Sequence, residues 1–170
     1  MIEIIRFKDK KYPLLQSQGF GSQYAFPFAQ KIIGKKDVVY DIGFCKPEWK
    51  FPFSIGVDIN NGDEFNAMNL PPLQADAIFS SHCLEHLPNW VEAINYWHSK
   101  LKKYGILFLY LPNMSYQEYW RNWSNRKHIH FIDPSIMKLY FEDNQEMWAN
   151  IFVTEGYDLN GSFYCIAEKI

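Results

Sequence analysis

The feature that most constrains the fold of this chain is a series of short apolar runs that alternate with helical patterns. Residues 37–43, 53–60, 75–81 and 105–112 are rich in β-branched and aromatic residues and end at turn signals, which predicts buried strands. The run 105–112, GILFLYLP, has no polar position, as expected when both faces of a sheet are covered. Strands that alternate with helices predict a mostly parallel sheet with helices on both faces.

Three helices and a closing hairpin complete the expected order. Residues 89–105 place apolar side chains at helical spacing and end at Gly105, which predicts a helix. Asp133 and Pro134 open a second helix over 133–144, and a short helix is expected near 22–33. The runs 148–157 and 162–169 predict an antiparallel hairpin. We therefore expect one domain over 1–170, with an N-terminal segment over 1–36 and an α/β core over 37–170.

Composition restricts the partners and the compartment. The net charge is −2 and no block of like charges occurs, so nothing predicts a general nucleic-acid or membrane-surface binder. The three cysteines, Cys45, Cys83 and Cys165, lack metal or disulfide spacing, which fits a reducing compartment. The N-terminus is neither a signal peptide nor a membrane span. We expect a cytoplasmic protein with no membrane partner, and the sequence leaves its oligomeric state open.

Polar residues gather where the predicted parallel strands end. The octapeptide SSHCLEHL, residues 80–87, follows the third strand directly, and Asp41 and Asp58 lie at the ends of the first two. The carboxyl ends of parallel strands meet at one edge, where open α/β sheets bind ligands. These three loops are therefore expected to converge on one crevice.

The order of the motifs resembles a known family. The segments VVYDIGFCKPEW, GVDIN, FNAMNLPPLQADAIFSSHCLEHL, LKKYGILFLYLPN and HIHFIDPSIMKLYF, which span roughly 37–142, are similar to class I S-adenosylmethionine-dependent methyltransferases, in particular the small type 11/23-like group. The resemblance implies a single-domain Rossmann-like methyltransferase sheet, mostly parallel with an antiparallel C-terminal hairpin. It also implies S-adenosylmethionine as the cofactor and methyl transfer as the activity.

The resemblance assigns cofactor contacts to positions of this chain. A glycine after the first strand permits a tight turn near the methionine part of the cofactor, and a carboxylate after the second strand can accept hydrogen bonds from a ribose diol. The implied cofactor residues are Asp41, Gly43, Phe44 and Cys45 at the methionine part, Asp58 and Ile59 at the ribose, Asn66, Ala67 and Met68 at the adenine, and Ser80 and Ser81 with His82 below the sulfonium.

The glycine-rich turn departs from the family pattern. Gly43 is followed by Phe44, Cys45, Lys46 and Pro47, whereas the family usually has two further glycines. Pro47 has no amide hydrogen and a fixed φ, so the loop must bend differently, and little room remains for a following helix. A degenerate methyltransferase fold that serves as a binding or scaffolding module is therefore the alternative function.

The octapeptide allows several roles. A zinc-peptidase box would need a helix through His82 and His86, which Pro88 disfavours. Some methyltransferases of RNA 3′ ends and of the ubiquinone pathway carry Glu-x-x-Glu-His here and hold a divalent metal. This chain matches at Glu85 and His86, has His82 in place of the first glutamate, and offers His128 or His130 as a later ligand. Without a metal, Glu85 and His86 could fix loops by hydrogen bonds, or His82, His86 or His130 could deprotonate an acceptor.

The acceptor is least determined by the sequence. Residues 116–131 interleave aromatic and basic side chains, which is typical of a wall that stacks on a sugar or nucleotide, or of a loop packed on a small core. Our first expectation is a hydroxyl group of a small molecule or glycan, with nucleic acid left open.

Overall fold

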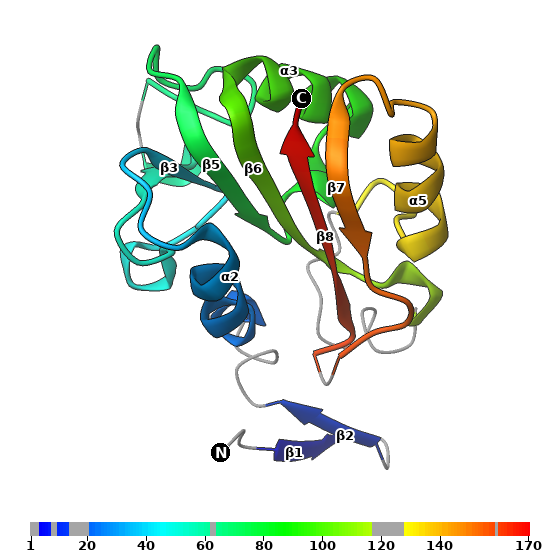
Figure 1. The fold of residues 1–170 in the computed structure, drawn as a ribbon. Coiled ribbons are helices and arrows are strands. Elements are labelled where there is room, and N and C mark those ends of the chain that lie inside the picture. Colours follow the sequence, from blue (N-terminus) through cyan, green and yellow to red (C-terminus); the bar gives the residue numbers. More distant parts are fainter. Residues whose placement is uncertain (1–3, 8–9, 14–20, 62–63, 117–127, 159) are drawn as a thin grey trace.

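A computed structural model describes residues 4–7, 10–13, 21–61, 64–116, 128–158 and 160–170. Its centre is a six-stranded sheet in the order β4-β3-β5-β6-β8-β7 (Figure 1). The four strands from β4 to β6 pair in parallel, and β8 pairs antiparallel with both β6 and β7. The bounds are β3 (Val39–Ile42), β4 (Ile55–Val57), β5 (Ala75–Ser81), β6 (Leu101–Pro112), β7 (Trp148–Val153) and β8 (Ser162–Lys169). The predicted α/β sheet with its antiparallel C-terminal pair is confirmed.

Helices cover both faces of this sheet, as expected. Helices α3 (Trp90–Lys100) and α5 (Pro134–Glu142) share one buried cluster with Leu107 and Leu109. Helix α2 (Phe26–Ile33) packs against the other face, where it shares a cluster with Phe108 and Tyr110. Because successive side chains of a strand point to opposite faces, the apolar run of β6 supplies both clusters.

The starts of two helices follow from their capping residues. The side chain of Asn89 accepts a hydrogen bond from the amide of Glu92 at 3.1 Å at the start of α3. At the start of α5, the carboxylate of Asp133 accepts from the amides of Ser135 at 2.9 Å and Ile136 at 3.1 Å. These bonds satisfy amides that have no partner inside the helix.

The predicted end of the helix over 89–105 is wrong. Helix α3 ends at Lys100, and Leu101 has extended backbone and pairs with Ala75 as the first residue of β6. Lys102 donates to Asp76 at 2.9 Å, so tertiary pairing draws this segment into the sheet. Gly105 lies inside the strand, where an added Cβ would approach the Lys102 carbonyl to 2.8 Å. The glycine therefore permits an irregularity of the strand and does not stop a helix.

The N-terminal region contains a hairpin that we did not expect. Strands β1 (Ile4–Phe7) and β2 (Lys10–Pro13) pair antiparallel, and the 3-10 helix η1 (Gly21–Tyr24) precedes α2. Strands β3, β4 and β7 are shorter than the apolar runs that predicted them. Residues 59–61 form a 3-10 helix after β4, and β7 ends at Val153. Within the described ranges, every helix is too short or too polar to cross a membrane.

Candidate functional site

The carboxyl ends of β3, β4 and β5 open onto one cavity of about 530 Å³. The residues that line it are Gly21, Ser22, Asp41, Gly43, Phe44, Cys45, Trp49, Val57, Asp58, Ile59, Asn60, Asn66, Ala67, Met68, Phe79, Ser81, His82, Cys83, His86, Leu87 and His128. The three loops therefore converge as the sequence predicts. Of the residues assigned to the cofactor, only Ser80 does not line the cavity.

The turn after β3 is built on a close contact with the octapeptide. Gly43 has a φ of +83°, and its amide donates to the Val57 carbonyl at 2.9 Å. A Cβ added to Gly43 would lie 2.5 Å from the Cβ of Cys83. The missing side chain therefore lets the loop after β5 approach the turn.

Cys45, two residues after Gly43, has a backbone conformation that favours glycine. Cys45 has a φ of 64°, and its amide donates to Oδ2 of Asp58 at 2.8 Å. Only a three-residue 3-10 helix, Pro47–Trp49, follows where the family usually has a longer helix. The sequence predicted this shortening, because Pro47 and Pro52 both restrict the backbone here.

Asp41 lies beneath the turn and is almost fully buried. Its Oδ2 accepts a hydrogen bond from the amide of Phe51 at 2.6 Å. Burial raises the pKa of Asp41 to about 7, against the opposing effects of the Phe51 amide and of Lys50. This carboxyl group therefore lies near the point of proton loss at neutral pH.

Asp58 combines a structural role with room for a ligand. Its Oδ2 accepts from Cys45 and its Oδ1 accepts from the amide of Asn60 at 2.7 Å. A carboxylate has about four lone-pair positions, so two remain for further donors. Asp58 lines the cavity, so its carboxylate can accept hydrogen bonds from the two hydroxyls of a diol.

The segment 66–68 forms another wall of the cavity. Asn66 and Asn69 form an isolated bridge, and Oδ1 of Asn66 accepts from the amide of Met68 at 2.9 Å. The indole of Trp97 donates to the Ala67 carbonyl at 2.7 Å, which fastens this loop to α3. Met68 and Ile59 are 39% and 77% exposed, so their side chains offer apolar surface at the rim.

The two serines at the end of β5 have different surroundings. The hydroxyl of Ser80 is buried and donates to the Ile42 carbonyl at 2.9 Å, so it links neighbouring strands. Ser81 lines the cavity, and its buried hydroxyl has no hydrogen-bond partner among the described residues. Of the two, Ser81 has the free hydrogen-bonding capacity that a ligand contact requires.

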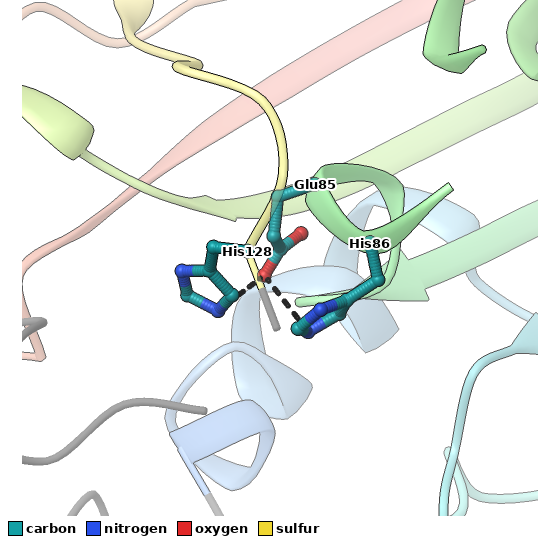
Figure 2. A group of neighbouring side chains, drawn as sticks. All are labelled: Glu85, His86 and His128. Atoms are coloured by element: carbon teal, nitrogen blue, oxygen red, sulfur yellow. Dashed lines mark ion pairs between the residues drawn. The ribbon is translucent and has the colours of Figure 1, made fainter. Parts of the chain in front are cut away.

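A buried carboxylate surrounded by imidazoles occupies the loop after β5. Glu85 is fully buried on the 3-10 helix η4 (Leu84–His86), and its Oε1 lies 3.9 Å from Nδ1 of His82, 3.9 Å from Nε2 of His86 and 3.6 Å from Nε2 of His128. Figure 2 shows the side chains of Glu85, His86 and His128 pointing toward one another from η4 and from the segment before α5. The short η4 also removes the helix that a zinc-peptidase box needs.

Burial governs the protonation of this cluster. It raises the pKa of Glu85 to about 8, despite a smaller opposing effect of the residue's own backbone amide. Burial, and then the neighbouring His86, lower the pKa of His128 to about 4. Burial followed by His128 and His86 lowers the pKa of His82 well below its usual value. The imidazoles of His82 and His128 are therefore neutral at neutral pH.

His130, which we expected as a candidate base, lies outside the cavity lining. Its Nε2 is 2.7 Å from the Leu87 carbonyl and 3.1 Å from the Pro88 carbonyl. The amide of Ile129 donates to the Glu85 carbonyl at 3.0 Å. These bonds fasten the segment 128–130 to η4 and thereby place His128 beside Glu85.

Several lining residues had no assignment from the sequence. Gly21 and Ser22 reach the cavity from a segment with no recognisable motif. Trp49, Cys83 and Leu87 belong to segments that carry the resemblance, but no role was assigned to them. For His128 the sequence predicts only a candidate role as a metal ligand. Most of the aromatic and basic stretch 116–131 lies outside the described residues, so its proposed stacking role stays a prediction.

Comparison with known structures agrees with this fold. The chain is similar to a SAM-dependent methyltransferase from Archaeoglobus fulgidus, with 20% identity, a TM-score of 0.61 and coverage of 91% of this chain and 98% of that one. It is similar to the N-methyltransferase NodS from Bradyrhizobium japonicum WM9 in complex with S-adenosyl-L-homocysteine, with 11% identity, a TM-score of 0.63 and coverage of 88% and 87%. A SAM-dependent methyltransferase from Thermotoga maritima matches with 16% identity, a TM-score of 0.65 and coverage of 92% of both chains.

No curated protein sequence matches the chain. A family model does: that of the methyltransferase domain matches residues 18–145, which is more than half of the 170 residues. The match includes the turn after β3, the octapeptide and the segment 128–130. The predicted resemblance is therefore confirmed, and the chain belongs to the methyltransferase domain family.

Proposed function

We propose that this protein transfers the methyl group of S-adenosylmethionine to a hydroxyl oxygen of a small-molecule or glycan acceptor. The observation that carries the proposal is the convergence of Asp41, Gly43 and Asp58 with the segment 66–68 on one cavity. These groups match the three parts of the cofactor: an amino acid, a ribose diol and a flat base. NodS, a structural neighbour, was solved with the demethylated product of this cofactor.

The strand order supports a division of the cavity. Strand β3 lies between β4 and β5, so Asp58 at the end of β4 and His82 at the end of β5 lie on opposite sides of the central turn. In the proposed arrangement the ribose lies on the side of Asp58. The acceptor approaches on the side of the imidazoles.

The neutral imidazole of His82 favours an acceptor that must lose a proton. Methyl transfer from a sulfonium depends mainly on in-line alignment, which can supply roughly 7–11 kcal/mol. As the carbon–sulfur bond breaks, its electron pair stays on sulfur, and the hydroxyl proton passes to a neutral base. His82 and His86 both line the cavity and are the proposed candidates for this base. General-base help of this kind contributes about 10²–10⁴-fold.

Calorimetric titration with S-adenosylhomocysteine tests the proposal. We expect one site per chain, and Asp58→Ala should weaken binding by about 1.5–3 kcal/mol, the range for a lost hydrogen bond to a charged group. The matched control is Asp37→Ala, which removes an exposed carboxylate just before β3, at the opposite end of that strand. Wild-type protein that shows no binding at millimolar ligand would support the scaffolding alternative instead.

A further inference from the structure

We propose that Glu85, His86 and His128 bind a divalent transition-metal ion of the zinc type, with His82 beside them, at the edge of the cavity. The inference begins with the carboxylate. Glu85 is fully buried, and neither of its oxygens accepts a hydrogen bond of ordinary geometry from the described residues. A buried carboxylate without compensation is costly, and bound metal ions are one of the usual solutions.

The distances distinguish a shared ion from direct hydrogen bonds. A charge-assisted bond between an imidazole and a carboxylate is about 2.7–2.9 Å long. The Glu85 oxygen lies 3.6 Å from the His128 nitrogen and 3.9 Å from the His86 nitrogen. Two ligands at about 2.0–2.1 Å from one tetrahedral ion are about 3.3 Å apart. The observed spacing is too long for hydrogen bonds and close to that of two ligands on one ion.

The three ligand atoms lie close to one another. One ligand atom from each residue lies within 4.8 Å of the others. The amide of Ile129, bonded to the Glu85 carbonyl, and the imidazole of His130, bonded to the Leu87 carbonyl, hold the two halves of the cluster together. His82 presents Nδ1 3.9 Å from the same Glu85 oxygen, while its Nε2 lies 2.8 Å from the Ser162 hydroxyl. Hydrogen bonding of the distal nitrogen commonly orients a metal-binding histidine.

The position of the cluster gives the ion a role. His82, His86 and His128 line the cavity, whereas Glu85 lies behind them, so the open side of an ion held here faces the cavity. This role rests on the proposed function. A cation that contacts an acceptor hydroxyl lowers its pKa, and the released proton passes to solvent, so with the ion bound the cation takes the place of the imidazole base.

The ligand types select the ion. Imidazole suits zinc, iron, nickel and copper, whereas magnesium prefers an octahedral shell of oxygen atoms. Two or three imidazoles with one carboxylate therefore favour Zn²⁺ over Mg²⁺. Co²⁺ is a useful probe because it accepts the same ligands and absorbs visible light.

The test is calorimetric titration of chelator-treated full-length protein with Zn²⁺ and with Mg²⁺, in the absence of cofactor. We expect one Zn²⁺ per chain, no measurable Mg²⁺ binding, and a Co²⁺ absorption band that Zn²⁺ abolishes. Loss of an outer-shell partner typically weakens metal binding 10–100-fold, so Glu85→Gln and His128→Gln should each weaken Zn²⁺ binding by at least about tenfold.

The matched control is His98→Gln. His98 lies on α3 and contacts the Met147 carbonyl at 3.1 Å, away from the cluster, so its substitution should change Zn²⁺ affinity less than about threefold. Circular dichroism establishes that each variant is folded. If Glu85→Gln does not fold, the cavity-lining His128→Gln decides the question.

Absence of Zn²⁺ binding by the wild type, or unchanged affinity in a folded ligand variant, overturns the inference. A separate titration with S-adenosylhomocysteine keeps the two proposals apart. Protein that binds the homocysteine derivative but no Zn²⁺ refutes the metal site alone. Protein that binds Zn²⁺ but not the derivative refutes the cofactor proposal alone.

Discussion

At the scale of single residues, the site depends on a missing side chain. Gly43 is the point at which the turn after β3 touches the loop after β5, and its Cα faces Cys83 with no space for a methyl group. Its φ of +83° is also in the left-handed region. Two separate physical requirements, conformation and space, therefore select glycine at this position.

Comparison of two alanine substitutions separates these requirements. Gly156 has a φ of +84° but nothing within 4 Å of an added Cβ. Gly156→Ala should lower the free energy of unfolding by about 1–2 kcal/mol, the cost of the left-handed conformation. Gly43→Ala should cost about 1–3 kcal/mol more, because its Cβ would overlap Cys83. Urea denaturation measures both, and equal losses would show that the contact with Cys83 carries no energy.

At the scale of elements, the turn between β3 and β4 holds a residue with a side chain in a conformation that favours glycine. Cys45 keeps the left-handed backbone that directs its amide to Asp58, although its side chain makes that conformation unfavourable. Pro47 begins a three-residue 3-10 helix in place of a longer one. The hydrogen bonds of Asp58 and Asp41 to the turn therefore offset an unfavourable local sequence.

Glycine at position 45 should relieve this strain. Cys45→Gly keeps the amide that donates to Asp58 and removes about 1–2 kcal/mol of left-handed strain. Glycine also raises the conformational entropy of the unfolded chain, which lowers the stability of the folded state by about 0.4–1 kcal/mol. We expect a net gain of up to about 1.6 kcal/mol in the free energy of unfolding, measured by urea denaturation. Cys45→Ala is the control and should give no gain. A less stable glycine variant would contradict the proposed strain.

At the scale of the whole molecule, the fold encloses acidic groups at the edge where its strands end. Asp41 and Glu85 are 2% and 0% exposed, and burial raises the pKa of both. A carboxyl group with a raised pKa in the folded state stabilises the fold at low pH. That contribution is lost as the pH rises through the folded-state pKa.

Asp41 makes this dependence measurable. With a folded-state pKa of about 7 and an ordinary value of 3.8, the folded protein holds a proton that the unfolded chain releases. The stability of the wild type relative to Asp41→Asn should therefore fall by about 1.4 kcal/mol between pH 6 and pH 8. Urea denaturation of both proteins at both pH values measures this difference. Subtracting the stability of the variant from that of the wild type removes the contribution of histidine titration, which the two proteins share. A pH-independent difference would show that Asp41 is ionised throughout this range.

The sequence by itself determined the order of the elements of the core and the edge at which the cavity lies. The apolar runs and the capping residues Asn89 and Asp133 act locally, so periodicity and composition reveal them. The placement of Asp41, Asp58 and the octapeptide at strand ends likewise follows from chain order alone, because parallel strands end at one edge.

Only the tertiary structure decided which side chains meet there. The helix over 89–105 ended early because β5 pairs with Leu101, a contact far away in sequence. His128, and not His130, faces the cavity because hydrogen bonds to the Glu85 and Leu87 carbonyls set the register of its segment. The approach of His128 to Glu85 joins residues more than 40 positions apart, and local sequence patterns carry no information about such contacts.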